Sequence, residues 1–209
     1  MGDRMLTDLK VETLLERVGS KEPVPGGGSC SALAGALAAS LVQMVAYLSG
    51  EEHGDVIDQA QVLVDRLSHL AERDTEAFQA VMVAYKLPKQ GEEGKRFRRV
   101  AIQSGLKMAT EVPLQVMNVA TDVLVLAKKM AVHGNANAIS DAGVAGLLAA
   151  AACRGAAYNV LINLPGLTDP EFVSEARGRV EEILVEADRL EQEIRQNVTQ
   201  VLIGALDRR

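Results

Sequence analysis

The chain has 209 residues without a long linker-like stretch, which predicts one domain over residues 1–209. Its formal net charge of −6 and its six aromatic side chains, none of them Trp, argue against a nucleic-acid partner, because such binding needs basic residues for phosphates and aromatic rings for bases. Two cysteines are too few for a disulfide framework and fit a reducing cytoplasm, and three widely separated histidines predict no metal site.

Helical periodicity dominates the chain and strand-like alternation is almost absent, which predicts an all-α fold. The first ten residues carry four charges and no apolar run, so we expect no signal peptide and a cytoplasmic location. A short first helix is expected to be capped by Thr7. Its inward-facing residues are predicted to be Leu14, Leu15 and Val18. Residues 23–28, Pro-Val-Pro-Gly-Gly-Gly, should end this helix and form a turn.

The next helix, residues 29–49, is uncharged and rich in small residues. Three of them, four positions apart, form a flat stripe on which another helix can pack closely: Ser31, Gly35 and Ala39. Residues 142–168 are similar, with Arg154 as their only charge. Both segments are long enough to cross a membrane, but Ala, Gly and Ser gain little from transfer into lipid. We therefore expect two central helices of a bundle and no membrane partner.

Three further helical stretches are predicted. Residues 55–87 form a long helix that ends before Pro88, and residues 92–133 form another that Pro113 should kink or split. After a loop at 134–139, Ser140 is expected to cap a helix that reaches Leu164. A final helix carries an inward apolar face of Val180, Ile183, Leu184, Ala187, Leu190, Ile194, Val198 and Val201. The sequence thus predicts a single-domain antiparallel helical bundle with long helices and small-residue packing.

A carboxylate interrupts the inward stripe of the helix at 55–87. The stripe recurs every three or four positions and consists of Ala60, Leu63, Leu67, Leu70, Asp74, Ala77, Val81 and Tyr85. A buried Asp74 must be paired with a charge or must hold a proton, because burial raises the pKa of a carboxyl group. Either condition suits general acid–base catalysis. A salt bridge to a neighbouring helix, or a solvated stretch of the stripe, explains the same pattern.

Two turns combine flexible backbone with polar groups. The segment Pro25-Gly26-Gly27-Gly28-Ser29 could bring backbone N–H groups close to an anion or a planar ligand, or could simply be a tight turn with Ser29 as a helix cap. In the segment 134–141, the amides of Asn135 and Asn137 suit a ring with donors and acceptors side by side, such as a pterin. Asn also tolerates turn geometry, so both interpretations stay open for each segment.

Six of the 22 basic residues lie within 14 positions: Lys86, Lys89, Lys95, Arg96, Arg98 and Arg99. In a chain with negative net charge, this cluster could attract an acidic ligand tail. A solvated start of a helix explains it equally well, and Glu92 and Glu93 dilute its charge.

Four segments, in order, resemble the cyclodeaminase/cyclohydrolase family, which includes the C-terminal domain of formiminotransferase-cyclodeaminase and stand-alone bacterial methenyltetrahydrofolate cyclohydrolases. They are PGGGS at 25–29, DTEAF at 74–78 with YKLPK at 85–89, GNANAISDAGVA at 134–145 and NVLINL at 159–164. Their order and spacing match across residues 7–205. The resemblance implies an all-helical fold, a homodimer and a folate pocket at or near the subunit contact.

The resemblance also implies roles for individual residues. The proposed catalytic aspartate of the family falls on Asp74, while relatives often carry a second aspartate where this chain has Glu72. We favour Asp74 because the stripe places it on the inward face. The residues expected to bind the pterin or, in the case of the lysine, the glutamate tail are Pro25, Gly26, Gly27, Gly28, Ser29, Lys89, Asn135, Asn137, Ser140 and Asp141.

Two reactions fit this resemblance. One is hydrolysis of 5,10-methenyltetrahydrofolate to 10-formyltetrahydrofolate, and the other is cyclodeamination of 5-formiminotetrahydrofolate to the methenyl compound and ammonia. One carboxylate can serve the proton transfers of either reaction, with no cofactor beyond the folate. We favour hydrolysis, because no formiminotransferase domain is attached. A non-catalytic folate-binding or scaffold protein is the alternative from another class, and a membrane-associated bundle is a third.

Overall fold

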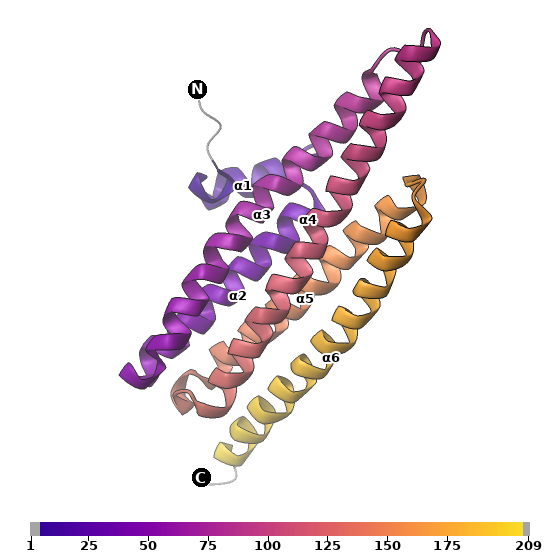
Figure 1. Cartoon of the computed structure of the whole chain (residues 1–209). Helices are drawn as coiled ribbons and strands as arrows, with labels where there is room; N and C mark the ends of the chain where they lie inside the picture. Colours follow the sequence, from indigo (N-terminus) through magenta and orange to yellow (C-terminus); the bar gives the residue numbers. More distant parts are fainter. Residues whose placement is uncertain (1–4, 207–209) are drawn as a thin grey trace.

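The computed structural model describes residues 5–206, and the predicted all-α fold is confirmed for this part of the chain, which contains no strand (Figure 1). Residues 1–4, which belong to the stretch considered for a signal peptide, lie outside it. Residues 5–206 form six α-helices, which are α1 (Val11–Val18), α2 (Gly27–Ser49), α3 (Gly54–Lys86), α4 (Glu92–His133), α5 (Ile139–Asn163) and α6 (Pro170–Leu206). Short 3₁₀ turns lie at Leu6–Asp8, Glu51–His53, Ala136–Ala138 and Leu164–Gly166.

The five long helices run side by side, and α3 and α4 form a hairpin that extends beyond the others (Figure 1). Helix α2 packs against α3, α4 and α5, whereas α6 covers α4 and α5. The core between them is continuous and consists mainly of Ala, Val and Leu side chains. The inward face predicted for the last helix is confirmed, since its eight residues are buried in this core or packed against it.

Small residues allow α2 and α5 to approach closely, as the stripe predicted. Gly35 faces Leu67 and Ala152, and a Cβ built on it would lie 3.1 Å from the Leu67 side chain. On the facing helix, a Cβ on Gly155 would lie only 2.4 Å from Ser31 Oγ. By length and composition alone, α2 and the segment Ala136–Gly166 could each cross a membrane, and about half of each is buried inside the bundle. Their other faces are exposed.

The first helix differs from the prediction. Thr7 lies in the 3₁₀ turn at Leu6–Asp8, and Lys10 is the residue that precedes α1. Leu14 packs against the core, but Leu15 is 64% exposed and Val18 is 40% exposed, so the predicted inward face is wrong for these two residues. The reason is that α1 lies at the edge of the bundle, where most of its apolar stripe has no partner within the chain (Figure 1).

Pro113 does not split the helix at 92–133, which continues as α4 through this position. Proline has no backbone N–H, so the carbonyl of Ala109 loses its usual helical donor. The side-chain amide of Asn163 on α5 donates to this carbonyl at 2.9 Å. A side chain 54 residues away in sequence therefore replaces the missing hydrogen bond.

Candidate active site

Asp74 lies on α3 with its carboxylate against the first turn of α2. The Ser29 hydroxyl donates to Asp74 Oδ2 at 2.9 Å. Gly28 lies directly beside the carboxylate, and a Cβ built on it would be 2.1 Å from Oδ1 and 2.7 Å from Oδ2. Only a residue without a side chain leaves room for Asp74 here. The segment 25–29 and Asp74, far apart in the sequence, therefore meet in one place.

The carboxylate occupies a desolvated position without a cationic partner. Burial raises the pKa of Asp74 above its ordinary value, and the hydroxyl and amide of Ser29 partly oppose that rise by hydrogen bonding. No arginine or lysine within residues 5–206 forms an ion pair with it. A carboxylate whose pKa is moved toward neutrality by burial can both accept and return a proton under physiological conditions.

Ser29 does not cap α2, and its hydroxyl is engaged within the protein. The helix begins at Gly27 with Gly26 as its cap, so Ser29 lies within the first turn. Its side chain is fully buried, and its hydroxyl also lies 3.2 Å from Thr75 Oγ1. The hydroxyl is engaged by Asp74 and Thr75, and a direct contact of Ser29 with substrate stays a prediction.

Glu72 has a different environment. Its carboxylate accepts a hydrogen bond from the backbone N–H of Leu6, and this ties the N-terminal 3₁₀ turn to α3. Glu72 thus ties down the N-terminal turn, whereas Oδ1 of Asp74 receives no side-chain hydrogen bond from the described residues. The arrangement favours Asp74 as the residue available for proton transfer.

Asn159 on α5 lies beside the glycine turn and was missed by the reasoning from sequence. A Cβ on Gly27 would be 3.4 Å from Asn159 Nδ2, which donates to the carbonyl of Gly155 at 2.8 Å. Asn163 lies one helical turn further along, and its amide donates to the carbonyl of Asn159. The signal available in the sequence was a pair of amides four positions apart in a helix with only two charged residues, Asp141 and Arg154.

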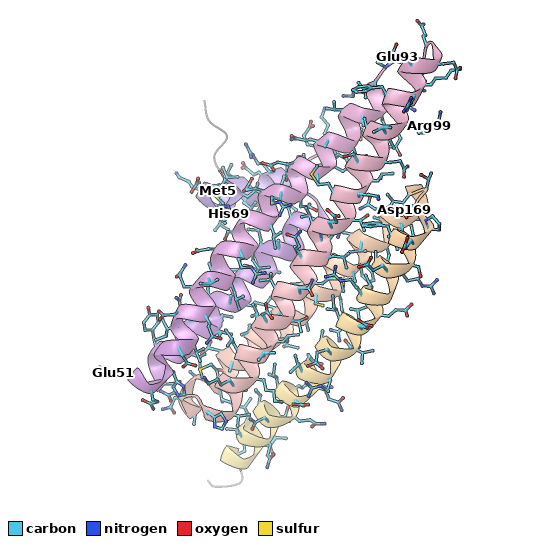
Figure 2. The ribbon with its side chains drawn as sticks, viewed as in Figure 1. Met5, Glu51, His69, Glu93, Arg99 and Asp169 are labelled. Carbon is cyan, nitrogen blue, oxygen red and sulfur yellow. The ribbon has the colours of Figure 1, made fainter. Side chains whose placement is uncertain are left out.

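The segment 134–141 lies at the opposite end of α2. The backbone N–H of Asn135 donates to Ser49 Oγ at 2.8 Å, and its side-chain amide donates to the carbonyl of Leu48 at 2.7 Å. Gly28 and Leu48 are 20 residues apart on one helix, which corresponds to about 30 Å. Asn137 and the other residues of this turn therefore cannot share a pocket with Asp74 of the same chain. Figure 2 shows Glu51, which follows α2, far from Asp169 and Arg99 at the other end.

The helix cap predicted in this turn is also wrong. Helix α5 begins at Ile139, so Ser140 is already its second residue, and no side chain caps the helix. Asn135 instead accepts the backbone N–H of Asn137 at 2.9 Å and stabilises the 3₁₀ turn. Asn137 and Ser140 are exposed, and Asp141 is half-buried. Two amide-bearing residues are thus held on the surface at this end of the bundle.

Lys89 lies at the tip of the α3–α4 hairpin, beyond the end of α3, and does not contact Asp74. With Lys95, Arg98 and Arg99 it lines a cavity of about 330 Å³ (Arg99 is labelled in Figure 2). Arg98 donates to the carbonyl of Tyr85 at 3.2 Å, while its Nε is buried without a partner. Asp74 and Lys86 are 12 residues apart on α3, or about 18 Å. The last stripe residue, Tyr85, is 45% exposed, because the hairpin leaves the bundle here.

Comparison with known proteins gives consistent matches over the chain. The sequence model of the formiminotransferase-cyclodeaminase family matches residues 10–182. The methenyltetrahydrofolate cyclohydrolase of Methylorubrum extorquens is 42% identical over 197 residues, which cover 90% of this chain and 95% of that protein. The formimidoyltransferase-cyclodeaminase of Rattus norvegicus is 32% identical over 194 residues, which cover 88% of this chain but only 36% of that longer protein.

A solved structure shares the fold. The crystal structure of formiminotetrahydrofolate cyclodeaminase from Thermotoga maritima superimposes with a TM-score of 0.85 and 28% sequence identity. The match covers 94% of this chain and 99% of that one, so it includes the whole bundle.

Proposed function

This chain belongs to the formiminotransferase-cyclodeaminase family, and we propose that it is a one-carbon folate enzyme that hydrolyses 5,10-methenyltetrahydrofolate to 10-formyltetrahydrofolate. The observation that carries this proposal is the desolvated Asp74 carboxylate beside Gly28, with one oxygen held by Ser29 and no ion pair to a cation of residues 5–206. The similarity over nearly the full length of a cyclohydrolase favours hydrolysis. The similarity to cyclodeaminases makes cyclodeamination the second candidate.

The reaction needs one group that first accepts a proton and then returns it. The methenyl carbon is held between two nitrogens as a cationic amidinium, and an ionised Asp74 stabilises this charge electrostatically. As water adds to the carbon, Asp74 takes one of its protons and a tetrahedral intermediate forms. The same group then returns the proton to the departing nitrogen as the bond from the carbon to that nitrogen breaks. The hydroxyl of the intermediate forms the C=O bond and releases its remaining proton to solvent, so the formyl group stays on the other nitrogen. We propose that no cofactor beyond the folate takes part.

The exposed faces of α2 and α5 support the proposal of a homodimer. The exposed large apolar side chains on them are Leu37, Met44, Tyr47, Leu48, Val144, Leu147, Tyr158, Leu161 and Ile162. Exposed apolar side chains on two helices that pack together favour a protein interface, and most homo-oligomers are two-fold symmetric. We propose that a second copy covers it, and that the chain works as a dimer in the cytoplasm and not in a membrane.

An antiparallel dimer would bring together the two predicted halves of the pocket, which lie far apart within one chain. A two-fold axis perpendicular to the helices reverses the second copy, so the partner's 134–141 turn lies near Asp74 of the first copy. We propose that the partner's Asn135, Asn137, Ser140 and Asp141 hold the pterin there, together with the 25–28 backbone. The cavity of Lys89, Lys95, Arg98 and Arg99 is proposed to meet the glutamate tail.

Two experiments test these statements. Incubation with each folate, followed in the near-ultraviolet band of the methenyl bridge, separates the reactions: loss of the band indicates hydrolysis, and its growth from the formimino compound indicates cyclodeamination. No change with either folate would refute the proposed enzyme.

For the shared pocket, Asp74→Asn and Asn137→Ala subunits are mixed and allowed to exchange. Recovery of activity supports sites built from two chains, and no recovery contradicts it.

A further inference from the structure

The buried hydroxyl of Ser29 connects two groups of α3. It lies 2.9 Å from Asp74 Oδ2 and 3.2 Å from Thr75 Oγ1, and its side chain has no access to solvent. A serine hydroxyl carries one proton and two lone pairs, and an ionised carboxylate can only accept. The Ser29 proton therefore goes to Asp74. Thr75 must then be the donor in the second contact, so the hydrogen bonds run from Thr75 to Ser29 to Asp74.

This chain of hydrogen bonds makes the two carboxylate oxygens different. Oδ2 accepts the Ser29 hydroxyl, while Oδ1 lies against Gly28 and receives no side-chain hydrogen bond from the residues that the structure describes. When Oδ1 takes up a proton, Oδ2 remains a carbonyl oxygen that can still accept from Ser29. The buried hydroxyl therefore keeps its partner in both protonation states, and no rearrangement of the site is needed during turnover.

We propose that Ser29, oriented by Thr75, is a positioning residue that fixes Oδ2 of Asp74, so that Oδ1 is the proton-exchanging atom. This inference rests on the proposed function only in its catalytic readout. The positioning itself is a property of the free protein.

The other groups around Asp74 do not provide an alternative source of this effect. Cys30 faces it from α2, but burial and the proximity of Asp74 raise the pKa of this thiol, so it stays neutral. On α3, the guanidinium of Arg73 donates to Gln115 and forms no ion pair with Asp74. From α5, the side chain next to the glycine turn is the uncharged amide of Asn159.

Two further factors could shift the pKa of Asp74: the neighbouring carboxylate of Glu72 and burial. Glu72, two residues earlier on α3, accepts the N–H of Leu6, and it is not among the groups that shift the pKa of Asp74. Burial is the larger effect and raises that pKa, while Ser29 lowers it through its hydroxyl and its amide. Removing the hydroxyl leaves burial less opposed, and the pKa of Asp74 should rise further.

The catalytic test compares two serines of the same helix. Ser31 is also buried, but its hydroxyl donates to the carbonyl of Gly27 at 2.7 Å and not to Asp74, so Ser31→Ala is the matched control. In Ser29→Ala, the acid limb of the kcat/KM profile should move to higher pH, because this limb reports the essential base of the free enzyme. At acidic pH, kcat/KM should fall about tenfold or more, the factor expected for loss of one hydrogen bond to a charged group.

Thr75 supplies a second variant that keeps the Ser29–Asp74 contact. Thr75→Val removes the donor to Ser29 without changing the shape of the side chain, and it should move the acid limb in the same direction but less. Thr75→Ser should restore the wild-type profile. An acid limb that stays in place in Ser29→Ala, as in Ser31→Ala, would overturn the inference.

A measurement without substrate separates this inference from the proposed function. The carboxyl ¹³C signal of Asp74, identified by its loss in Asp74→Asn, is titrated by NMR in the wild type and in Ser29→Ala. A midpoint at higher pH in Ser29→Ala supports the positioning role, even if no folate is turned over. Equal midpoints overturn it, even if folate hydrolysis is confirmed.

Discussion

Gly28 offers a sharp test of the site, because one added methyl group meets the Asp74 carboxylate. In Gly28→Ala the new Cβ would lie 2.1 Å from Oδ1 and 2.5 Å from Cγ of Asp74, far inside an ordinary contact of at least 3.4 Å. The backbone of α2 is held in the bundle by its neighbours, so the carboxylate is the group that must withdraw. Displacement of a reacting group by about 1 Å lowers turnover roughly 100-fold, and we expect a loss of that size in kcat.

The stability of this variant should change much less. Overpacking costs about 1–3 kcal/mol, while replacing Gly by Ala at a compatible backbone position gains about 0.4–1 kcal/mol. The control for an added methyl group is Gly178→Ala on α6, where nothing lies within 4 Å of the new Cβ. Urea unfolding gives the free energy of unfolding of both variants, and steady-state hydrolysis gives their kcat.

The double variant Gly28→Ala/Asp74→Asn shows whether Gly28→Ala lowers kcat through the carboxylate of Asp74. If it does, adding Gly28→Ala to Asp74→Asn should reduce kcat little further, because coupled sites are not additive. Two results would refute the reasoning: a folded Gly28→Ala protein with wild-type kcat, or a full 100-fold loss on top of Asp74→Asn.

Three further predictions concern single side chains. Asp74→Asn should be at least as stable as the wild type at neutral pH. Burial raises the pKa of Asp74, so the wild type loses stability as the pH rises from the ordinary carboxyl pKa through the raised one. Unfolding measured at several pH values should show this loss only in the protein that contains Asp74. Glu72→Gln keeps an acceptor for the N–H of Leu6, so it should cost less than about 1 kcal/mol and retain turnover, whereas abolished turnover would identify Glu72 as the proton carrier. Arg98→Ala should raise KM severalfold for oligo-γ-glutamyl folates but not for the monoglutamate, and an equal rise for both would remove the proposed tail site.

The helices and the importance of Asp74 could be predicted because both depend on local periodicity. A carboxylate at an inward position of a 3.6-residue repeat is visible without any knowledge of its neighbours. The groups that it meets are not visible in this way. Ser29 is 45 residues away and looked like a helix cap, because a serine after a glycine turn is typical of a cap.

The failures have the same origin. The effect of Pro113 was overestimated because the amide of Asn163 on another helix restores the lost hydrogen bond. The sequence also did not show that α2 separates the segments 25–29 and 134–141 of one chain by its full length, because this depends on how the helices are connected in space. The apolar face of α1 was expected to turn inward, yet most of it is exposed within a single chain.

The most direct test of the account is the kcat of Asp74→Asn with 5,10-methenyltetrahydrofolate, measured beside the wild type under identical conditions. If Asp74 carries the proton, the variant should lose about 100-fold to 10,000-fold in kcat while its unfolding transition stays at least as high as that of the wild type. Hydrolysis at the wild-type rate by the folded variant would contradict the account.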